Sequence, residues 1–123
     1  MSNNYEKYLS KEDKFQRAVM QYFKNQYPEA YVIHPPNEGK RSPYERFKFK
    51  QLGGKSGIPD VLCFAPNDSY NGLALELKVG YNKPTQNQKD ALEALKTSGW
   101  YSTWVKDLDT TIELIDKYFK NDL

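Results

Sequence analysis

The feature that most constrains the fold is a pair of short apolar segments separated by a turn-rich stretch. Residues 60–64 read Asp-Val-Leu-Cys-Phe, and residues 73–79 read Leu-Ala-Leu-Glu-Leu-Lys-Val. The eight residues between them include Pro66, Asn67, Asp68 and Gly72, which are typical of turns. This pattern predicts two strands joined as an antiparallel hairpin. Because a lone hairpin is only marginally stable in water, other elements must pack against it.

The remaining elements follow from apolar spacing and from residues that start or stop helices. We expect helices over 11–26, 85–99 and 108–119, and strands over 31–34 and 100–105. From Pro35 to Gly57 the periodicity is lost, with a short helix around 45–52 as the one candidate element. The fold class is therefore α/β, a small mixed four-stranded sheet flanked by helices, formed by one domain over residues 1–123.

Composition excludes several kinds of site. Cys63 and His34 are the single cysteine and the single histidine, so no internal disulfide and no zinc site of the Cys/His type can form. Any metal would have to be held by oxygen. No apolar run approaches the roughly 20 residues that span a bilayer, and the N-terminal ten residues lack an apolar signal region. We therefore expect a cytoplasmic protein with no membrane segment.

The charges are segregated along the chain. The net charge is +2, but residues 39–55 carry +5, which leaves −3 for the rest. The basic residues are Lys40, Arg41, Arg46, Lys48, Lys50 and Lys55, and Tyr44, Phe47 and Phe49 lie among them. A basic segment on a slightly acidic body is typical of a surface that contacts a polyanion such as DNA. A solvated basic loop or helix face is an equally open interpretation of this feature.

The acidic residues of the hairpin indicate chemistry. Glu76 and Lys78 lie two residues apart and share one face of their strand, where they could be a solvated pair worth about 1 kcal/mol or less. However, Asp60 opens the other strand, whose uninterrupted apolar run predicts burial on both faces. An antiparallel hairpin brings Asp60 close to Glu76 and Lys78. Clustered carboxylates favour a hard cation such as Mg²⁺ or Mn²⁺, and such a site suits phosphodiester hydrolysis.

These residues resemble the PD-(D/E)XK nuclease motif. Pro59-Asp60 is followed after fifteen residues by Glu76-Leu77-Lys78. The flanking residues are similar to one branch, the VRR-NUC domain, and the matching positions are His34, Asn37, Gly39, Arg41, Gly53, Lys55, Gly57, Gln88 and Lys89. The resemblance runs from about residue 12 to residue 119. It implies a restriction-endonuclease-like core with the order αβββαβ plus a C-terminal helix.

The resemblance also implies roles for individual residues. Asp60 and Glu76 would hold Mg²⁺ or Mn²⁺ together with the backbone carbonyl of Leu77, and Lys78 would serve the attacking water. Glu12, four residues before Gln16, would reach the metal through water, although the helix dipole alone also favours an acid in a first turn. Gln88 would belong to the catalytic set, or be an ordinary polar residue at a helix start. Asn37 and the basic residues of 40–55 would contact DNA.

The function implied is that of a metal-dependent endonuclease that acts on branched DNA, such as four-way (Holliday) junctions, as a homodimer. Two alternatives stay open at this point. One is a nuclease of the same fold that acts on flaps, ends or a specific duplex site. The other is a catalytically silent DNA-binding module, which the presence of Asp60, Glu76 and Lys78 together disfavours.

Overall fold

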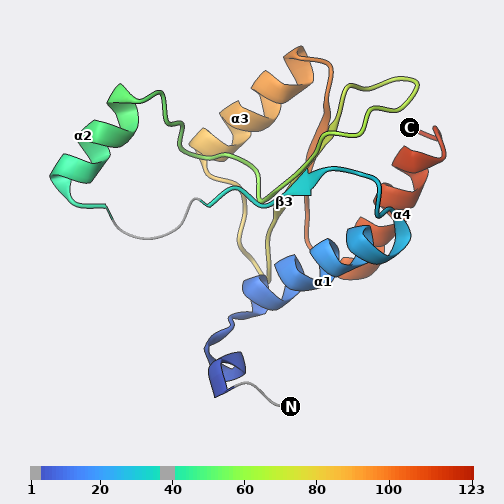
Figure 1. The fold of residues 1–123 in the computed structure, drawn as a ribbon, viewed down its shortest axis with the longest axis horizontal. Coiled ribbons are helices and arrows are strands. Elements are labelled where there is room, and N and C mark those ends of the chain that lie inside the picture. Colours follow the sequence, from blue (N-terminus) through green and yellow to red (C-terminus); the bar gives the residue numbers. More distant parts are fainter. Residues whose placement is uncertain (1–3, 37–40) are drawn as a thin grey trace.

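The computed structural model describes residues 4–36 and 41–123, and these contain a mixed sheet between helices (Figure 1). Its strands, in spatial order, are β1 (Val32–Ile33), β2 (Val61–Cys63), β3 (Leu73–Leu77) and β4 (Tyr101–Val105). β2 pairs with β1 and with β3 antiparallel, whereas β3 and β4 are parallel. The predicted hairpin and the predicted small mixed sheet are therefore confirmed.

The helices begin at residues that cap them. The described helices are the 3₁₀ helix η1 (Asn4–Tyr8), α1 (Lys11–Gln26), α2 (Pro43–Gln51), α3 (Gln86–Thr97) and α4 (Leu108–Phe119). Ser10, Ser42 and Thr85 each form a capping box at the start of α1, α2 and α3. The short helix expected around 45–52 starts earlier, at Pro43, because Ser42 caps it and proline suits the first helical position.

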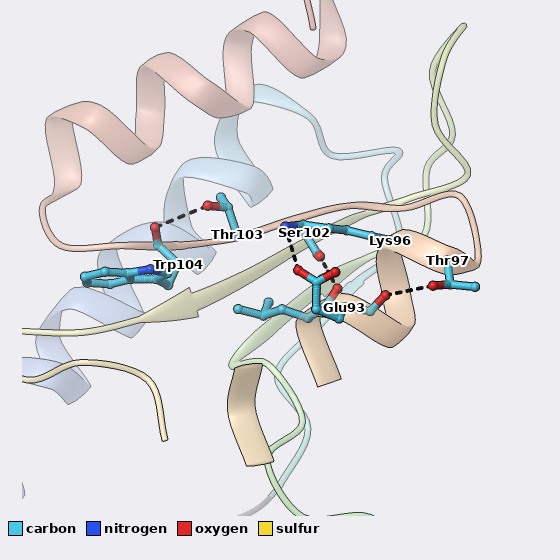
Figure 2. A network of polar contacts seen from close by, with 7 residues as sticks. Glu93, Lys96, Thr97, Ser102, Thr103 and Trp104 are labelled. Atoms are coloured by element: carbon cyan, nitrogen blue, oxygen red, sulfur yellow. Dashed lines mark hydrogen bonds and ion pairs between the residues drawn. The ribbon is translucent and has the colours of Figure 1, made fainter. Parts of the chain in front are cut away.

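The helices cover both faces of the sheet. Figure 1 shows α1 and α4 together on one side, with α3 on the other side. The main core lies between the sheet and α1 and α4, and its fully buried members include Val19, Leu75 and Ile115. On the α3 side, the Ser102 hydroxyl on β4 donates to the carbonyl of Leu92 and so ties α3 to the sheet (Figure 2).

Strand β3 is buried on both faces, so the interpretation of Glu76 and Lys78 as a solvated strand face is wrong. All five residues of β3 are buried, and Glu76 and Lys78 are only 2% and 8% exposed. The cause is α3, which forms the crossover between the parallel strands β3 and β4 and covers the second face. In β2, by contrast, Leu62 is only partly buried although Val61 and Cys63 are fully buried.

The contact between α1 and α4 fixes the position of α1. The hydroxyls of Tyr22 and Tyr27 each donate to Asp116 Oδ1 on α4, both at 2.6 Å. The hydrogen bond to this carboxylate, with burial, raises the pKa of Tyr22 to about 12. The Tyr27 ring also stacks on Phe119, with 3.9 Å between the centroids. These contacts therefore hold the C-terminal end of α1 against α4.

Helix α2 stands apart from the body of the molecule (Figure 1). None of its residues is buried. It ends in a Schellman motif, in which Gly53 N donates to Lys50 O and Gly54 N donates to Phe49 O. Gly53 has φ of +86°, which the motif requires and which glycine adopts most readily. The glycine pair thus serves the turn that leads from α2 toward β2.

None of the helices in the described part of the chain is long and apolar enough to cross a membrane.

Candidate active site

The pairing of β2 with β3 brings two carboxylates together. Val61 lies opposite Leu75, so one further step along the antiparallel register places Asp60 opposite Glu76. The Asp60 carboxylate is anchored, because its Oδ2 accepts a hydrogen bond of 2.8 Å from the backbone N–H of Leu77. The predicted approach of Asp60 to Glu76 is therefore present in the structure. The contact of Asp60 with Leu77 is through the N–H, and the predicted role of the Leu77 carbonyl stays a prediction.

Lys78 completes this cluster. Its Nζ lies 3.1 Å from Glu76 Oε2, and the two side chains are 10% and 2% exposed. Burial and the nearby charge of Asp60 raise the pKa of Glu76 to about 7, although Lys78 acts in the opposite direction. Burial and Asp60 thus disfavour the charged form of the Glu76 carboxyl, whereas the neighbouring Lys78 ammonium favours that form.

Glu12, in the first turn of α1, interacts electrostatically with the same site. Burial raises its pKa, and the charge of Asp60 raises it further, whereas Lys78 lowers it. Glu12 is not the capping acid of its helix, because Asp13 Oδ2 accepts the backbone N–H of Ser10 in the capping box. The structure thus places Glu12 in the electrostatic neighbourhood of Asp60 and Lys78, which a first-turn acid serving only the helix dipole would not need.

The arrangement has the chemistry of a hard-cation site. Glu76 Oε1 is buried and has no hydrogen-bond partner, although Oε2 of the same carboxylate is paired with Lys78. Within residues 4–36 and 41–123, no three His, Cys, Asp or Glu side chains stand in an arrangement that could hold a metal by themselves. Asp60, Glu76 and the adjacent Leu77 peptide supply two carboxylates and a carbonyl, so the donors fit an oxygen-ligated divalent ion.

Solved structures of other proteins are similar to this chain. A solved structure described as "VRR_NUC domain protein" is 31% identical and superposes with a TM-score of 0.76, covering 90% of this chain and 89% of that one. The chain belongs to the VRR-NUC family. A second structure, "VRR_NUC domain", is 21% identical, with a TM-score of 0.53 over 85% of this chain and 97% of that one, and shares the fold. Neither a family model nor a curated protein matches the sequence.

Family membership makes the chain a nuclease domain, and it confirms the predicted VRR-NUC resemblance and fold class. Two further residues lie next to the VRR-NUC site: His34, which the sequence matches to the family pattern without a defined role, and Trp104, which the sequence left unassigned. His34 Nδ1 lies 2.6 Å from the backbone oxygen of Asp60 and so braces the start of β2. Trp104 on β4 pairs with Glu76 in the parallel register (Figure 2 shows its position on β4). Its proximity could not be read from the sequence, because local patterns do not reveal which strand adds in parallel.

Gln88 has a structural contact in this VRR-NUC domain. Its side-chain oxygen accepts the backbone N–H of Thr85 at 2.9 Å, so it closes the capping box of α3. The start of α3 also packs on the motif that precedes Asp60. Gly57 has φ of +79°, and a Cβ on it would stand 2.6 Å from the backbone of Asn87. A role for Gln88 in the reaction stays a prediction.

The basic residues divide into three groups. Arg41, Arg46, Lys50 and Lys55 line one groove beside α2. Lys48 is exposed on α2 but does not line that groove. Lys40 and Asn37 lie outside the described residues. Tyr44 and Phe47, the aromatic residues between these cations, are 69% and 62% exposed.

Proposed function

We propose that this VRR-NUC domain is a Mg²⁺- or Mn²⁺-dependent DNA endonuclease that cuts branched DNA, such as four-way junctions, as a homodimer. The observation that carries the proposal is the buried Glu76 carboxylate. It lies opposite Asp60 and next to Lys78, and one of its oxygens has no partner. A buried carboxylate beside a second acid and an ammonium is costly to a fold and is understandable where a cation and a phosphate are bound.

In this proposal Asp60, Glu76 and the Leu77 carbonyl hold the ion, and Glu12 contacts it through water. A bound divalent ion polarises a phosphoryl oxygen and lowers the pKa of water. Asp60 is already oriented for such binding by its hydrogen bond to the Leu77 N–H. The restricted exposure of Glu76 limits competition from bulk water for its oxygens.

Lys78 is suited to act on the attacking water and on the developing charge. Its ammonium can donate hydrogen bonds but cannot accept them, so it orients a water oxygen and stabilises a negative phosphoryl group. The contact with Glu76 Oε2 holds the ammonium at a defined place in the site. In this proposal Glu12, whose pKa is raised by burial, accepts a proton released from water.

Branched DNA is the proposed substrate because the exposed cations of residues 41–55 suit phosphate contacts, which carry no sequence information. A single site of this kind cuts one strand. A two-fold pair of chains can cut two strands that are related by the symmetry of a junction. This is the reason for proposing a homodimer.

The affinity of the cation site for a divalent ion should depend on pH, because Glu76 must lose its proton to bind the ion. We expect the protein to bind Mn²⁺ about tenfold more weakly at pH 6 than at pH 8, because a carboxyl of pKa about 7 is mostly protonated at pH 6 and the ion must then displace a proton. Isothermal titration calorimetry measures both affinities. Glu76→Gln should lose most of the affinity, whereas Glu113→Gln, at an exposed site on α4, should behave as the wild type. Equal wild-type affinities at the two pH values would contradict this assignment.

The proposed activity is tested with labelled four-way-junction, flap and linear duplex DNA of matched sequence, each with Mg²⁺, Mn²⁺ or EDTA. We expect paired nicks near the branch point of the junction in either metal, and no cleavage in EDTA. Faster cutting of flaps or duplex would support the same fold with a different substrate. Binding without cleavage in any metal would overturn the proposal in favour of a silent DNA-binding module.

A further inference from the structure

A groove beside the active site is not explained by cleavage alone. It lies between α2 and α3 and has a volume of about 680 Å³. Cavities of roughly 300–1,000 Å³ accommodate compact ligands. Helix α2, which buries none of its own side chains, forms one wall of the groove. Helix α2 thus contributes to this groove, although it contributes no buried residue to the core.

The lining combines an apolar floor with a cationic rim. Its apolar residues, which include Ile58, Leu62, Ala91 and Leu95, are here called the floor, and its cationic residues the rim. Four cationic residues, Arg41, Arg46, Lys50 and Lys55, line the groove against one acidic residue, Asp90. Asp90 also accepts a hydrogen bond from the side chain of Gln86. Such a groove is complementary to a ligand that carries phosphates on one side and flat apolar groups on the other.

One cation of the rim, Arg41, stacks on an aromatic ring. The Arg41 guanidinium lies over the Phe49 ring, 4.0 Å from its centroid. Gly54 packs closely on Phe49, because a Cβ on Gly54 would stand 2.4 Å from that ring. Gly54, in the turn after α2, thus supports the Phe49 ring, and the planar guanidinium of Arg41 lies over that ring. Planar guanidinium groups stack on nucleic-acid bases that are not paired.

The floor of the groove continues into the active site. Asp60 and Leu62 are two residues apart on the β2 segment, so their side chains point to the same face of the sheet. Pro59, which directly precedes Asp60, also lines the groove. A strand of DNA whose phosphate lies at Asp60 and Glu76 can therefore extend along the groove.

We propose that this groove binds unpaired nucleotides of the DNA substrate, with their phosphates on the cationic rim and their bases against the apolar floor and Arg41. The inference rests on the proposed function and names the part of the substrate that the enzyme selects. The bases of an intact duplex are stacked and paired inside, so they cannot reach such a floor. Bases freed at a branch point or in a single strand can reach it.

The test compares single-stranded oligo-dT with duplex DNA by fluorescence anisotropy in EDTA, where no cleavage occurs. Ala91→Phe fills the floor without a change of charge. We expect it to weaken oligo-dT binding roughly tenfold or more, because the larger side chain occupies the space in which a base would pack. Its duplex affinity should stay within about twofold of wild type. Lys50→Ala should also weaken oligo-dT binding more than Lys48→Ala, because both lysines are exposed on α2 but only Lys50 lines the groove.

A second variant keeps the test decisive if Ala91→Phe does not fold, as judged by circular dichroism. Arg41→Lys retains the positive charge but replaces the planar guanidinium group with an ammonium group. Wild-type protein should quench 2-aminopurine placed in the oligonucleotide, and Arg41→Lys should quench it less. Unchanged oligo-dT binding by folded Ala91→Phe would overturn the inference, as would a change from dimer to monomer in sedimentation, which would identify the groove as a contact between chains.

Failure of this inference is distinguishable from failure of the proposed function. If the wild type cuts DNA with metal but Ala91→Phe binds oligo-dT normally, the nuclease assignment stands and the groove assignment fails. If the wild type never cuts but Ala91→Phe loses oligo-dT binding, the groove assignment stands without the nuclease activity.

Discussion

Lys78→Ala is expected to lower the rate of DNA cleavage by roughly 10²–10³-fold or more, the loss seen when one stabilising donor is removed from a transition state. DNA binding should change little, because Lys78 is only 8% exposed and contributes little to the charged surface. The variant should also fold. Once Lys78 is gone, the buried Glu76 carboxyl, whose pKa is already raised to about 7, can take up a proton and become neutral.

Single-turnover cleavage of a four-way junction and anisotropy with the same DNA measure the two effects separately. Lys106→Ala is the control, since Lys106 is an exposed lysine just after β4. Lys78→Met, which retains the aliphatic part of the side chain, separates loss of the ammonium from loss of packing. Wild-type cleavage by folded Lys78→Ala would remove Lys78 from the proposed mechanism.

Gly57→Ala is expected to lower the free energy of unfolding by about 3 kcal/mol. Two effects combine. The φ of +79° is unfavourable for alanine, and the new Cβ would stand 2.6 Å from the backbone carbon and oxygen of Asn87, which cannot rotate away as a side chain can. The collision is with the start of α3, so the chain around Pro59 and Asp60 should also shift.

Gly53→Ala provides the matched comparison. Gly53 has a similar φ of +86°, but nothing lies within 4 Å of the position where its Cβ would stand. Its loss should be limited to the backbone strain, about 1 kcal/mol. Urea denaturation of both variants gives the two values. Equal losses would mean that the close contact between Gly57 and α3 contributes nothing to stability.

Local elements were predictable because their causes are local. The bounds of α1 follow from Ser10, which caps it, and from apolar residues at helical spacing. The hairpin followed from two apolar segments and the turn residues between them, and its register then brought Asp60 to Glu76. These parts of the fold and of the site depend on interactions close together in the sequence or across one turn.

Other features depend on contacts that no local pattern records. The alternation in β3 left open a solvated face for Glu76 and Lys78, and only the packing of α3 shows that this face is covered. The parallel pairing that sets Trp104 beside Glu76 joins strands separated by a helix. Gln88 shows the same limit, because its sequence position suggests a place in the site whereas its side chain caps α3 in the structure.

The isolation of α2 has a consequence for how this protein can diverge. A helix that buries no side chain can exchange almost any of them without loosening the core. Glu76, by contrast, lies on a strand enclosed on both faces, and the buried Lys78 follows directly after it. Substitutions in α2 can therefore change the groove, and with it the preferred DNA, with little loss of folding stability. The hydrolytic centre has no such freedom. Related chains should thus keep the centre while their α2 segments drift apart.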